Sequence, residues 1–376
     1  MKISVEKKNI IETLANIQGI TGKRSSLAIT ENILITAQEN KISICATDIE
    51  TGFEGIYPAD VEKEGVVTIN AKYFYDIVKK ISGEKIYIKE GENRLVMISD
   101  TEDGEKLKYN ILGAEPDDFP QLPKIEEVSY VEVDSLLLKN MIMWATMVTP
   151  GATEKRAHIV GAYLEIIDDK GQNKIRMIST DGKRLTKTQF QCKIDDEQEK
   201  GKKIIIPKKA LSELFKFLKE KGKTKIGIKD NYFIVKNKSE TIYVNILSGQ
   251  FPDLTSLFKD EKRIEVKLKK NRFKDMLERM AILTSDNYKG VFFKFDKNRL
   301  VINAANPEKG EAFEYMEIDF KDKKKEMMFN PYYFIDAINI IEGEDVLIKI
   351  KDEHIPCIVC GIKNQDNINI IMPMKI

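Results

Sequence analysis

A seven-residue pattern that occurs three times decides the fold. Residues 70–76 read Asn-Ala-Lys-Tyr-Phe-Tyr-Asp, residues 207–213 read Pro-Lys-Lys-Ala-Leu-Ser-Glu, and residues 330–336 read Asn-Pro-Tyr-Tyr-Phe-Ile-Asp. Each follows an apolar run and ends on an acid, and Asn or Pro at the start suits a helix N-terminus. A glycine follows each one, where a left-handed C-cap is expected, at Gly83, Gly222 and Gly343. The pattern predicts one helix at the same place in three repeats.

Three further features recur in the same order along the chain. An amphipathic helix with a 3.6-residue period is predicted over residues 7–19, 134–149 and 270–283. A strand ends in a polar turn at Ala46-Thr47-Asp48, Ser179-Thr180-Asp181 and Ala305-Asn306. A closing strand is read at Asn110-Ile111-Leu112, Asn245-Ile246-Leu247 and Asn369-Ile370-Ile371.

These repeats divide the chain into three domains, near residues 1–126, 127–258 and 259–376. Between the helices lie alternating strands, such as residues 41–45 and 174–178. The predicted fold class is therefore α+β, with two helices packed on antiparallel sheets in each repeated domain.

Composition is that of a globular protein without a membrane segment. Of 376 residues, 42% are apolar and 32% are charged, and the net charge is +1. No run of 18 apolar residues occurs, and the strand-like N-terminus lacks the apolar core of a signal peptide. We expect a cytoplasmic protein.

Four cysteines are too few for a disulfide framework in a chain of this length. Cys357 and Cys360 form a CxxC inside a strand-like run, so their thiols should face opposite sides of a sheet. Two reduced structural cysteines are therefore expected in place of a metal or redox site.

Residues that could carry catalysis are scarce. Only His158 and His354 are histidines, in different repeats, and no phosphate loop, GxSxG or HExxH is present. Asp48 and Asp181 come singly at strand-end turns. A metal-dependent nucleic-acid enzyme that uses these two carboxylates is the alternative, but we predict a non-enzymatic protein with no cofactor and no metal.

Basic residues lie on the helix faces that the apolar stripe leaves free. Charge alone leaves two interpretations open, an ordinary solvated surface and sequence-independent contact with the phosphates of double-stranded DNA. Few aromatic residues accompany them, which favours duplex over stacked single strands. The residues predicted to face DNA are Lys23, Arg24, Lys72, Lys208, Lys209 and Arg272.

The sequence resembles the bacterial DNA sliding clamp, the beta subunit of DNA polymerase III. Residues 180–185 (Thr-Asp-Gly-Lys-Arg-Leu) are similar to the family's Thr-Asp-Gly-His-Arg-Leu, and residues 250–253 (Gln-Phe-Pro-Asp) to its Arg-Phe-Pro-Asp. Residues 306–308 (Asn-Pro-Glu) and the ending Met-Pro-Met-Lys-Ile at 372–376 also resemble family segments. The resemblance covers the whole chain in order.

The resemblance implies a processivity factor, two copies of which join head to tail into a ring around duplex DNA. Its helices would line the hole, and topology would retain it on DNA. Implied partners are the replicative DNA polymerase, the clamp loader and other proteins with a clamp-binding motif, which insert a short peptide with a Gln and apolar anchors and gain a high effective concentration at the template.

The resemblance also implies a peptide pocket between the second and third domains. Two methionines and a proline at the chain end suit an adaptable apolar surface, although they would equally finish a core strand. Lys183 replaces the family's usual His, and Ser256 stands where a basic residue is common. The implied pocket residues are Ile159, Thr180, Gly182, Lys183, Arg184, Leu185, Pro252, Leu257, Tyr333, Ile370, Met372, Pro373 and Met374.

The ring interface implied by the resemblance has an apolar centre with charges of opposite sign around it. An ordinary domain core remains the alternative for Ile282 and Leu283. A purely structural interaction protein without a DNA role is a third hypothesis. The implied interface joins Tyr73, Ile77, Lys106 and Tyr109 of one subunit to Ile282, Leu283, Glu308, Glu311 and Glu314 of the other.

Overall fold

A computed structural model of the chain describes residues 1–22, 27–150, 156, 159–194, 196–258, 262–285, 287 and 289–375, without the side chains of Thr255 and Ser256. Two compact units divide it, residues 1–139 with 192–246 and residues 140–191 with 247–376. None of the helices within these described ranges is long and apolar enough to cross a membrane.

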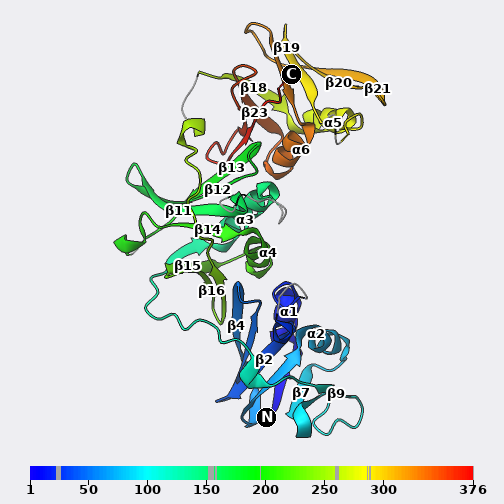
Figure 1. Cartoon of the computed structure of the whole chain (residues 1–376), viewed down its shortest axis with the longest axis vertical. Helices are drawn as coiled ribbons and strands as arrows, with labels where there is room; N and C mark the ends of the chain where they lie inside the picture. The colour runs from blue at the N-terminus through cyan, green and yellow to red at the C-terminus, as the bar shows by residue number, and fades with distance from the viewer. Residues whose placement is uncertain are drawn as a thin grey trace. The chain divides into compact units, whose positions relative to one another are not determined.

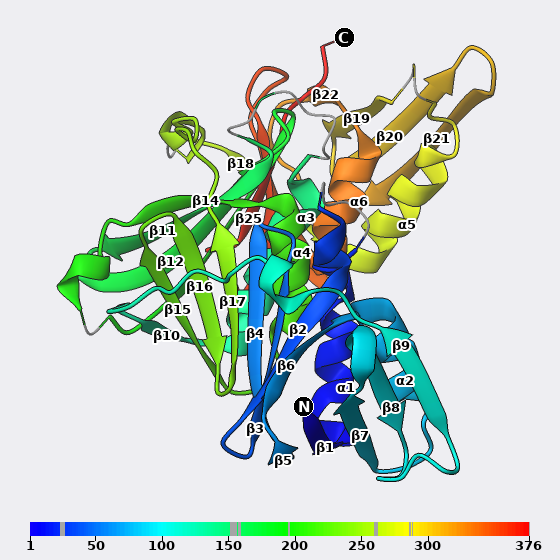
Figure 2. The same cartoon turned by 60° about the horizontal axis from the view of Figure 1, so that its bottom comes forward.

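The first unit contains two antiparallel sheets, of strand order β5-β1-β7-β8-β9 and β10-β15-β16-β17-β4-β3-β2-β6 (Figure 1 and Figure 2). Its helices are α1 (Lys7–Asn16), α2 (Ala71–Lys80) and α4 (Lys208–Phe217). Its strands are β1 (Lys2–Glu6), β2 (Asn32–Gln38), β3 (Lys41–Thr47), β4 (Thr51–Pro58), β5 (Asp60–Lys63), β6 (Gly65–Asn70), β7 (Lys85–Glu90), β8 (Leu95–Ser99), β9 (Lys108–Leu112), β10 (Val131–Asp134), β14 (Lys203–Pro207), β15 (Lys223–Lys229), β16 (Tyr232–Asn237) and β17 (Glu240–Asn245). Helix α3 follows β10 and spans Ser135–Val148.

The second unit contains the strand order β11-β12-β13-β25-β24-β23-β18 and the four-stranded sheet β21-β20-β19-β22. Helices α5 (Lys270–Ala281) and α6 (Pro331–Ile340) contact each other (Figure 2). The strands are β11 (Gly161–Asp169), β12 (Gln172–Thr180), β13 (Arg184–Gln191), β18 (Ile264–Lys269), β19 (Val291–Asp296), β20 (Arg299–Asn306), β21 (Gly310–Glu317), β22 (Lys325–Phe329), β23 (Asp345–Ile350), β24 (Cys357–Gly361) and β25 (Ile368–Ile371).

Helix pairs bury their apolar faces against these sheets, as the 3.6-residue periods predict. In α1, Ile10 and Leu14 are fully buried, and α1 contacts α2. In the second unit, Phe273 of α5 meets Phe334 of α6 edge-on at 6.0 Å between ring centroids, and both rings touch Phe293 of β19. Such buried aromatic contacts stabilise beyond the area they remove from water. The predicted α+β class, with two helices packed on antiparallel sheets in each repeated domain, is confirmed.

The starts of the repeated helices were predicted better than their ends. Asn70 accepts a hydrogen bond from Tyr73 N and Asn330 accepts one from Tyr332 N, so both cap helices as expected. The glycine C-caps were wrong, because the cap residues of α2, α4 and α6 are Ile81, Leu218 and Ile341, all in extended conformations. Burial of these apolar residues fixes the exit of each helix without a left-handed glycine.

Two strand pairings join neighbouring repeats, and they have the same register. In the first junction β4 pairs with β17 (Thr51 opposite Val244), and in the second junction β13 pairs with β25 (Arg184 opposite Ile371). Asn245 N donates to Glu50 O at 2.8 Å, and Met372 N donates to Lys183 O at 2.9 Å. Asn245 therefore corresponds to Met372, and the sequence alignment that set Asn245 against Asn369 was wrong by three residues.

The turns that lead into β4 and β13 share one hydrogen-bond pattern. Thr47 Oγ1 accepts from Ile49 N at 2.9 Å, as Thr180 Oγ1 accepts from Gly182 N at 3.0 Å. Asp48 Oδ1 accepts from Thr51 N at 2.6 Å, as Asp181 Oδ1 accepts from Arg184 N at 2.9 Å. Both turns need a positive φ at their third residue, which is 84° at Gly182 and 79° at Ile49.

We predict that Ile49→Gly stabilises the protein by about 1 kcal/mol, because a β-branched residue with positive φ is strained by about 1–3 kcal/mol and glycine is not. Ile49 is also 51% exposed, so little burial is lost. The measurement is the urea midpoint. The matched change Gly182→Ala should lower that midpoint, and a loss of stability in Ile49→Gly would contradict the strain.

Candidate functional site

A pocket of about 160 Å³ opens beside the second junction. The turn between β12 and β13 supplies one wall, the end of β25 a second wall, and the segment around Pro252 a third. Its lining is mostly apolar with two arginines, which suits an extended peptide with apolar side chains. The lining residues are Arg156, Ile159, Thr180, Gly182, Arg184, Leu185, Pro252, Leu254, Leu257, Ile370 and Met372.

The turn wall is rigid because its polar groups are satisfied locally. Thr180 Oγ1 donates to Arg184 O at 2.7 Å, and the Asp181 carboxylate accepts from Lys183 N and Arg184 N, both at 2.9 Å. Gly182 allows close approach, since a Cβ there would lie 2.9 Å from Arg156 Nη1. The turn therefore presents a fixed backbone and a small residue to whatever enters the pocket.

The Arg184 guanidinium forms the most connected polar group of the pocket. Its Nε donates to Asp181 Oδ2 at 3.1 Å, its Nη1 to Asp336 Oδ2 at 2.5 Å, and its Nη2 to Met147 O at 3.2 Å. Its central carbon lies 4.5 Å from the centroid of the Tyr333 ring. Two carboxylates, a carbonyl and an aromatic face thus fix its orientation.

A small apolar cluster forms the floor of the pocket. Ile178, Leu185, Ile368 and Ile370 are buried in it, with Leu254 and Leu257 packed above. Tyr163 stacks on Phe251 at 4.9 Å between centroids, and this burial raises the pKa of Tyr163 to about 12. The segment after β17 is thereby held over the sheet and forms the third wall.

The structure brings together nine of the thirteen residues predicted for the pocket. Tyr333 supports the pocket through Arg184, Lys183 O binds Met372 N, and Met374 N donates to Met328 O at 2.7 Å. Lys183, Tyr333, Pro373 and Met374 are not among the lining residues, and Ser256 lies outside the described side chains. The sequence analysis missed Arg156 and Leu254. A signal for Leu254 was present, because it lies two residues after Phe251-Pro252, just as Leu122 lies two residues after Phe119-Pro120 in the first repeat.

The residues predicted to face DNA have different environments. Lys23 and Arg24 lie outside the described residues, and Lys72 is exposed on α2. Lys208 begins α4. Lys209 Nζ forms an ion pair with Asp48, whose side chain is only 2% exposed. Arg272 Nη2 pairs with Glu314 Oε1 at 2.7 Å and stays half-exposed.

The residues predicted for a subunit interface lie at two places. Tyr73 on α2 is 59% exposed and Tyr109 on β9 is 38% exposed, but Ile77 is buried in the first unit. Lys106 is exposed just before β9. At the second place, just after α5, Ile282 is 70% exposed. Leu283 packs against the buried cluster that contains Phe273, Phe293 and Phe334.

The three acids predicted for that interface lie in or next to β21. Glu308 and Glu311 are exposed. Glu314 accepts from Arg279 at 2.7 and 2.8 Å. The hydrogen bond from the Arg279 guanidinium, more than any other contact, lowers the pKa of the Glu314 carboxyl. Glu314 is thus neutralised within the chain, whereas Glu308 and Glu311 present their charge to solvent.

The groups weighed for metal or redox chemistry are otherwise engaged. Asp48 is bound by Lys209 and Asp181 by Arg184. No cluster of three potential metal ligands occurs within the described residues. Cys357 and Cys360 are buried in two different apolar clusters, so their thiols face opposite sides of β24 as predicted.

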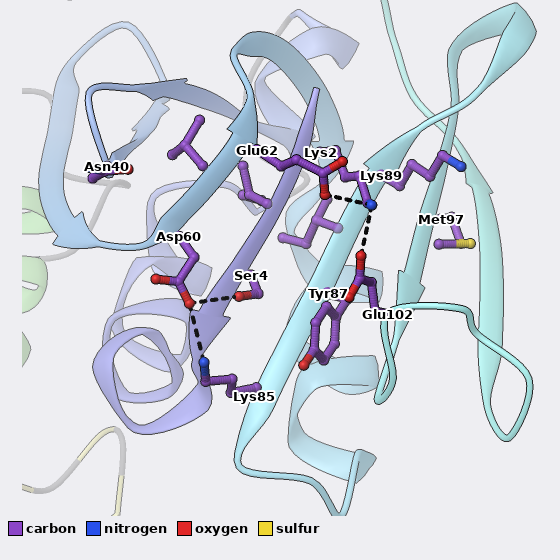
Figure 3. A pocket seen from close by; sticks show the side chains of 13 residues that line it. Lys2, Ser4, Asn40, Asp60, Glu62, Lys85, Tyr87, Lys89, Met97 and Glu102 are labelled. Atoms are coloured by element: carbon purple, nitrogen blue, oxygen red, sulfur yellow. Dashed lines mark hydrogen bonds and ion pairs between the residues drawn. The ribbon is translucent and has the colours of Figure 1, made fainter.

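A second hollow, of about 430 Å³, lies on the sheet that contains β1, β5 and β7 (Figure 3). Most of its charged groups pair with one another: Lys2 with Glu62 and Glu102, and Lys85 with Asp60, which also accepts from Ser4. Exposed pairs of this kind contribute little energy. Because its lining is mostly charged or polar, the hollow offers a ligand less apolar surface than the pocket beside the second junction.

Three helix-and-sheet repeats, joined through strand edges at two junctions and carrying an apolar pocket beside one of them, define the class of DNA clamps. The sequence matches family models described as the N-terminal, central and C-terminal domains of the DNA polymerase III beta subunit, over residues 1–123, 132–253 and 255–375. The chain belongs to the DNA polymerase III beta subunit family.

Relatives and solved structures agree with this assignment over the full length. A beta sliding clamp from Bacillus subtilis is 24% identical, with 100% of both chains covered. A crystal structure of the DNA polymerase sliding clamp from the same organism has a TM-score of 0.91 at 23% identity and covers 100% of this chain and 99% of that one. A Pseudomonas aeruginosa sliding clamp bound to griselimycin also has a TM-score of 0.91, at 22% identity and 100% coverage of both chains.

We predict that Lys209→Met lowers the free energy of unfolding by about 1–3 kcal/mol, because it leaves the buried Asp48 carboxylate without its cation. The control change Lys221→Met, at a lysine just after α4, should alter it by less than about 0.5 kcal/mol, since Lys221 is exposed. Urea unfolding of both variants gives the comparison. Equal midpoints for the two would contradict a structural role for Lys209.

Proposed function

We propose that two copies of this chain close head to tail into a ring that slides on duplex DNA and tethers DNA polymerase. The proposal deepens the family's function, that of a DNA sliding clamp, by naming the edges that meet and the residues that dock partners. One observation carries it. Two junctions inside the chain share one strand register, and two further edge strands, β9 and β21, are left to form a third junction between two copies.

Rows of paired residues align the three closing strands. A row here is the set of residues that lie directly opposite one another on neighbouring strands of one sheet. Three rows correspond, one in each repeat: Ile3, Ile88, Ile98 and Tyr109; Val131, Ile226, Val235 and Ile242; and Val266, Ile348, Val359 and Asn369. The rows correspond because their first residues occupy the same position. Ile3, Val131 and Val266 each lie three residues before the end of the strand (β1, β10 or β18) that leads into the first helix of the repeat. Tyr109 of β9 is therefore the counterpart of Ile242 and Asn369.

A second set of rows aligns β21 with β4. Val67, Ile35, Ile44 and Gly55 form one row, and Met327, Phe293, Ile302 and Glu314 form its counterpart. Ala312 thus corresponds to Phe53, which lies opposite Ile242 in the first junction. The equivalent pairing across subunits sets Ala312 of one copy opposite Tyr109 of the other.

Both edges are open within the described residues. Strand β9 ends one sheet and β21 ends another, and neither has a second neighbour. Apolar side chains stand exposed beside them, with Leu112 at 64%, Phe313 at 73% and Ile282 at 70%. Free edges with exposed apolar residues pair readily with another chain, and a contact of two different surfaces that closes makes a ring.

Charge supports the same pairing. Lys106 is exposed two residues before β9 and Lys72 is exposed on α2, while Glu308 and Glu311 are exposed just before and within β21. Lys72 on α2 is the counterpart of Lys209 on α4. Lys209 forms an ion pair with Asp48 in the turn of the first junction. We therefore assign Lys72 to ring closure as well as to the DNA-facing set.

The DNA contact we propose is weak, basic and independent of sequence. Lys72, Lys208 and the half-exposed Arg272 supply positive charge, Lys209 is paired with Asp48, and Lys23 and Arg24 lie outside the described residues. Loose phosphate contacts of this kind permit sliding, so the closed ring provides retention. We propose no enzymatic activity, a cytoplasmic location, and domain limits near residues 126 and 258.

The pocket beside the second junction is the proposed docking site for polymerase, clamp loader and other clamp-binding proteins. Its small volume suits a few side chains of an extended peptide, and Met372 at its rim can adjust to different partners. The Pseudomonas aeruginosa relative binds griselimycin. We propose that griselimycin would compete with partner peptides at this pocket.

The ring predicts a specific cross-link. In an antiparallel pair, directly opposite Cα atoms lie about 4.5–5.5 Å apart, which suits a disulfide. The double variant Ala312→Cys with Tyr109→Cys should therefore give a covalent dimer on mild oxidation, read by electrophoresis without reductant. Burial raises the pKa of the native Cys45 and Cys192 thiols to about 11, which keeps them unreactive.

The control shifts the register by two residues, with Ala312→Cys and Ile111→Cys. Efficient cross-linking of the shifted pair, or none in either variant, would overturn the proposed third junction. Sedimentation of the unmodified chain should show a dimer at micromolar concentration.

A further inference from the structure

The Arg184–Asp336 contact goes beyond what the strand register of the junction requires. The first junction has the same register, yet Thr51 stands where the second has Arg184. On α4, Glu213 stands where α6 has Asp336, and it is bound by Lys216 Nζ at 3.0 and 3.1 Å. The first junction instead links its helix to its turn through Lys209 and Asp48, whereas in the second junction the paired arginine, Arg184, lines the pocket.

Arg184 is the residue through which α6 reaches the pocket. Its side chain is 14% exposed and lines the pocket, while Asp336 on α6 is not among the lining residues. Asp181 and Met147 O bind the other two guanidinium nitrogens, so three of the five N–H groups are engaged within the described residues. The remaining N–H groups can donate to an acceptor in the pocket.

We infer that Asp336 is a positioning residue for partner binding, which fixes the Arg184 guanidinium so that it donates to a carbonyl oxygen of the docked peptide. This inference rests on the proposed docking function. An arginine side chain loses about 2 kcal/mol of rotamer freedom when it is immobilised. A site that holds the guanidinium in place beforehand removes that cost from peptide binding.

Geometry explains why the acid must come from α6. Asp181 reaches only Nε, and it belongs to the same turn as Arg184. Asp336 holds Nη1 and, with the Tyr333 ring one turn earlier on α6, fixes the plane of the guanidinium. A peptide oxygen in this plane accepts the hydrogen bond at a lower entropic cost when the plane is fixed beforehand. Movement of α6 therefore changes the donor side of the pocket.

The test measures the affinity of the full-length dimer for a fluorescein-labelled short peptide with one glutamine and two leucine anchors. Asp336→Asn should raise the dissociation constant about tenfold, and Asp336→Glu should restore part of the affinity. Asp322→Asn, an exposed acid in the same domain, is the matched control and should leave binding unchanged. Thermal unfolding and sedimentation of each variant show that the fold and the dimer persist.

A double-mutant cycle separates positioning from a general structural role. If Asp336 acts through Arg184, Asp336→Asn should have almost no further effect in an Arg184→Gln background. Full additivity of the two substitutions, or unchanged peptide affinity in Asp336→Asn alone, would overturn the inference but not the proposed docking function of the pocket. Failure of the unmodified protein to bind the peptide or griselimycin would overturn the proposed docking function, and the inference with it.

Discussion

Pairing between strand edges is the constraint on which the structure depends. Each repeat presents one strand, β4 or β13, to the closing strand of the next repeat, β17 or β25, in an identical register. Backbone hydrogen bonds give this contact its direction, and buried pairs such as Phe53 with Ile242 give it apolar area. Because three repeats in one chain satisfy only two junctions, one edge of each kind remains, and a second copy can satisfy both.

The side chains around this common backbone have diverged, and function follows from the divergence. The first junction is held by Lys209 with Asp48, and Leu122 packs on Gly52. In the second, Leu185 replaces Gly52, Leu254 lines an open pocket, and Arg184 connects that pocket to α6. The same fold element thus serves as a structural joint at one position and as a partner site at the next.

Much of this could be predicted from the sequence because the signals are local. N-cap asparagines, 3.6-residue periods and the Thr-Asp turns recur with the repeats, and the family resemblance implied nine of the eleven residues that line the pocket. The ends of helices and the alignment of the closing strands could not be predicted, because burial and sheet register fix them. Asn245 and Asn369 are similar only in sequence, whereas Asn245 and Met372 make the equivalent hydrogen bond. The partner of Lys209, likewise, is set by the first junction and not by nearby residues.

Release from DNA on linearisation tests the central claim, topological retention by a closed ring, most directly. The protein is loaded by a bacterial clamp loader onto a singly nicked circular plasmid, separated from free protein by gel filtration, and then treated with a restriction enzyme that cuts once. The closed ring predicts retention on the circle and loss on cutting, with retention restored when bulky proteins block both ends. Equal retention on circular and linear DNA would show that the protein grips DNA directly, and would contradict the account.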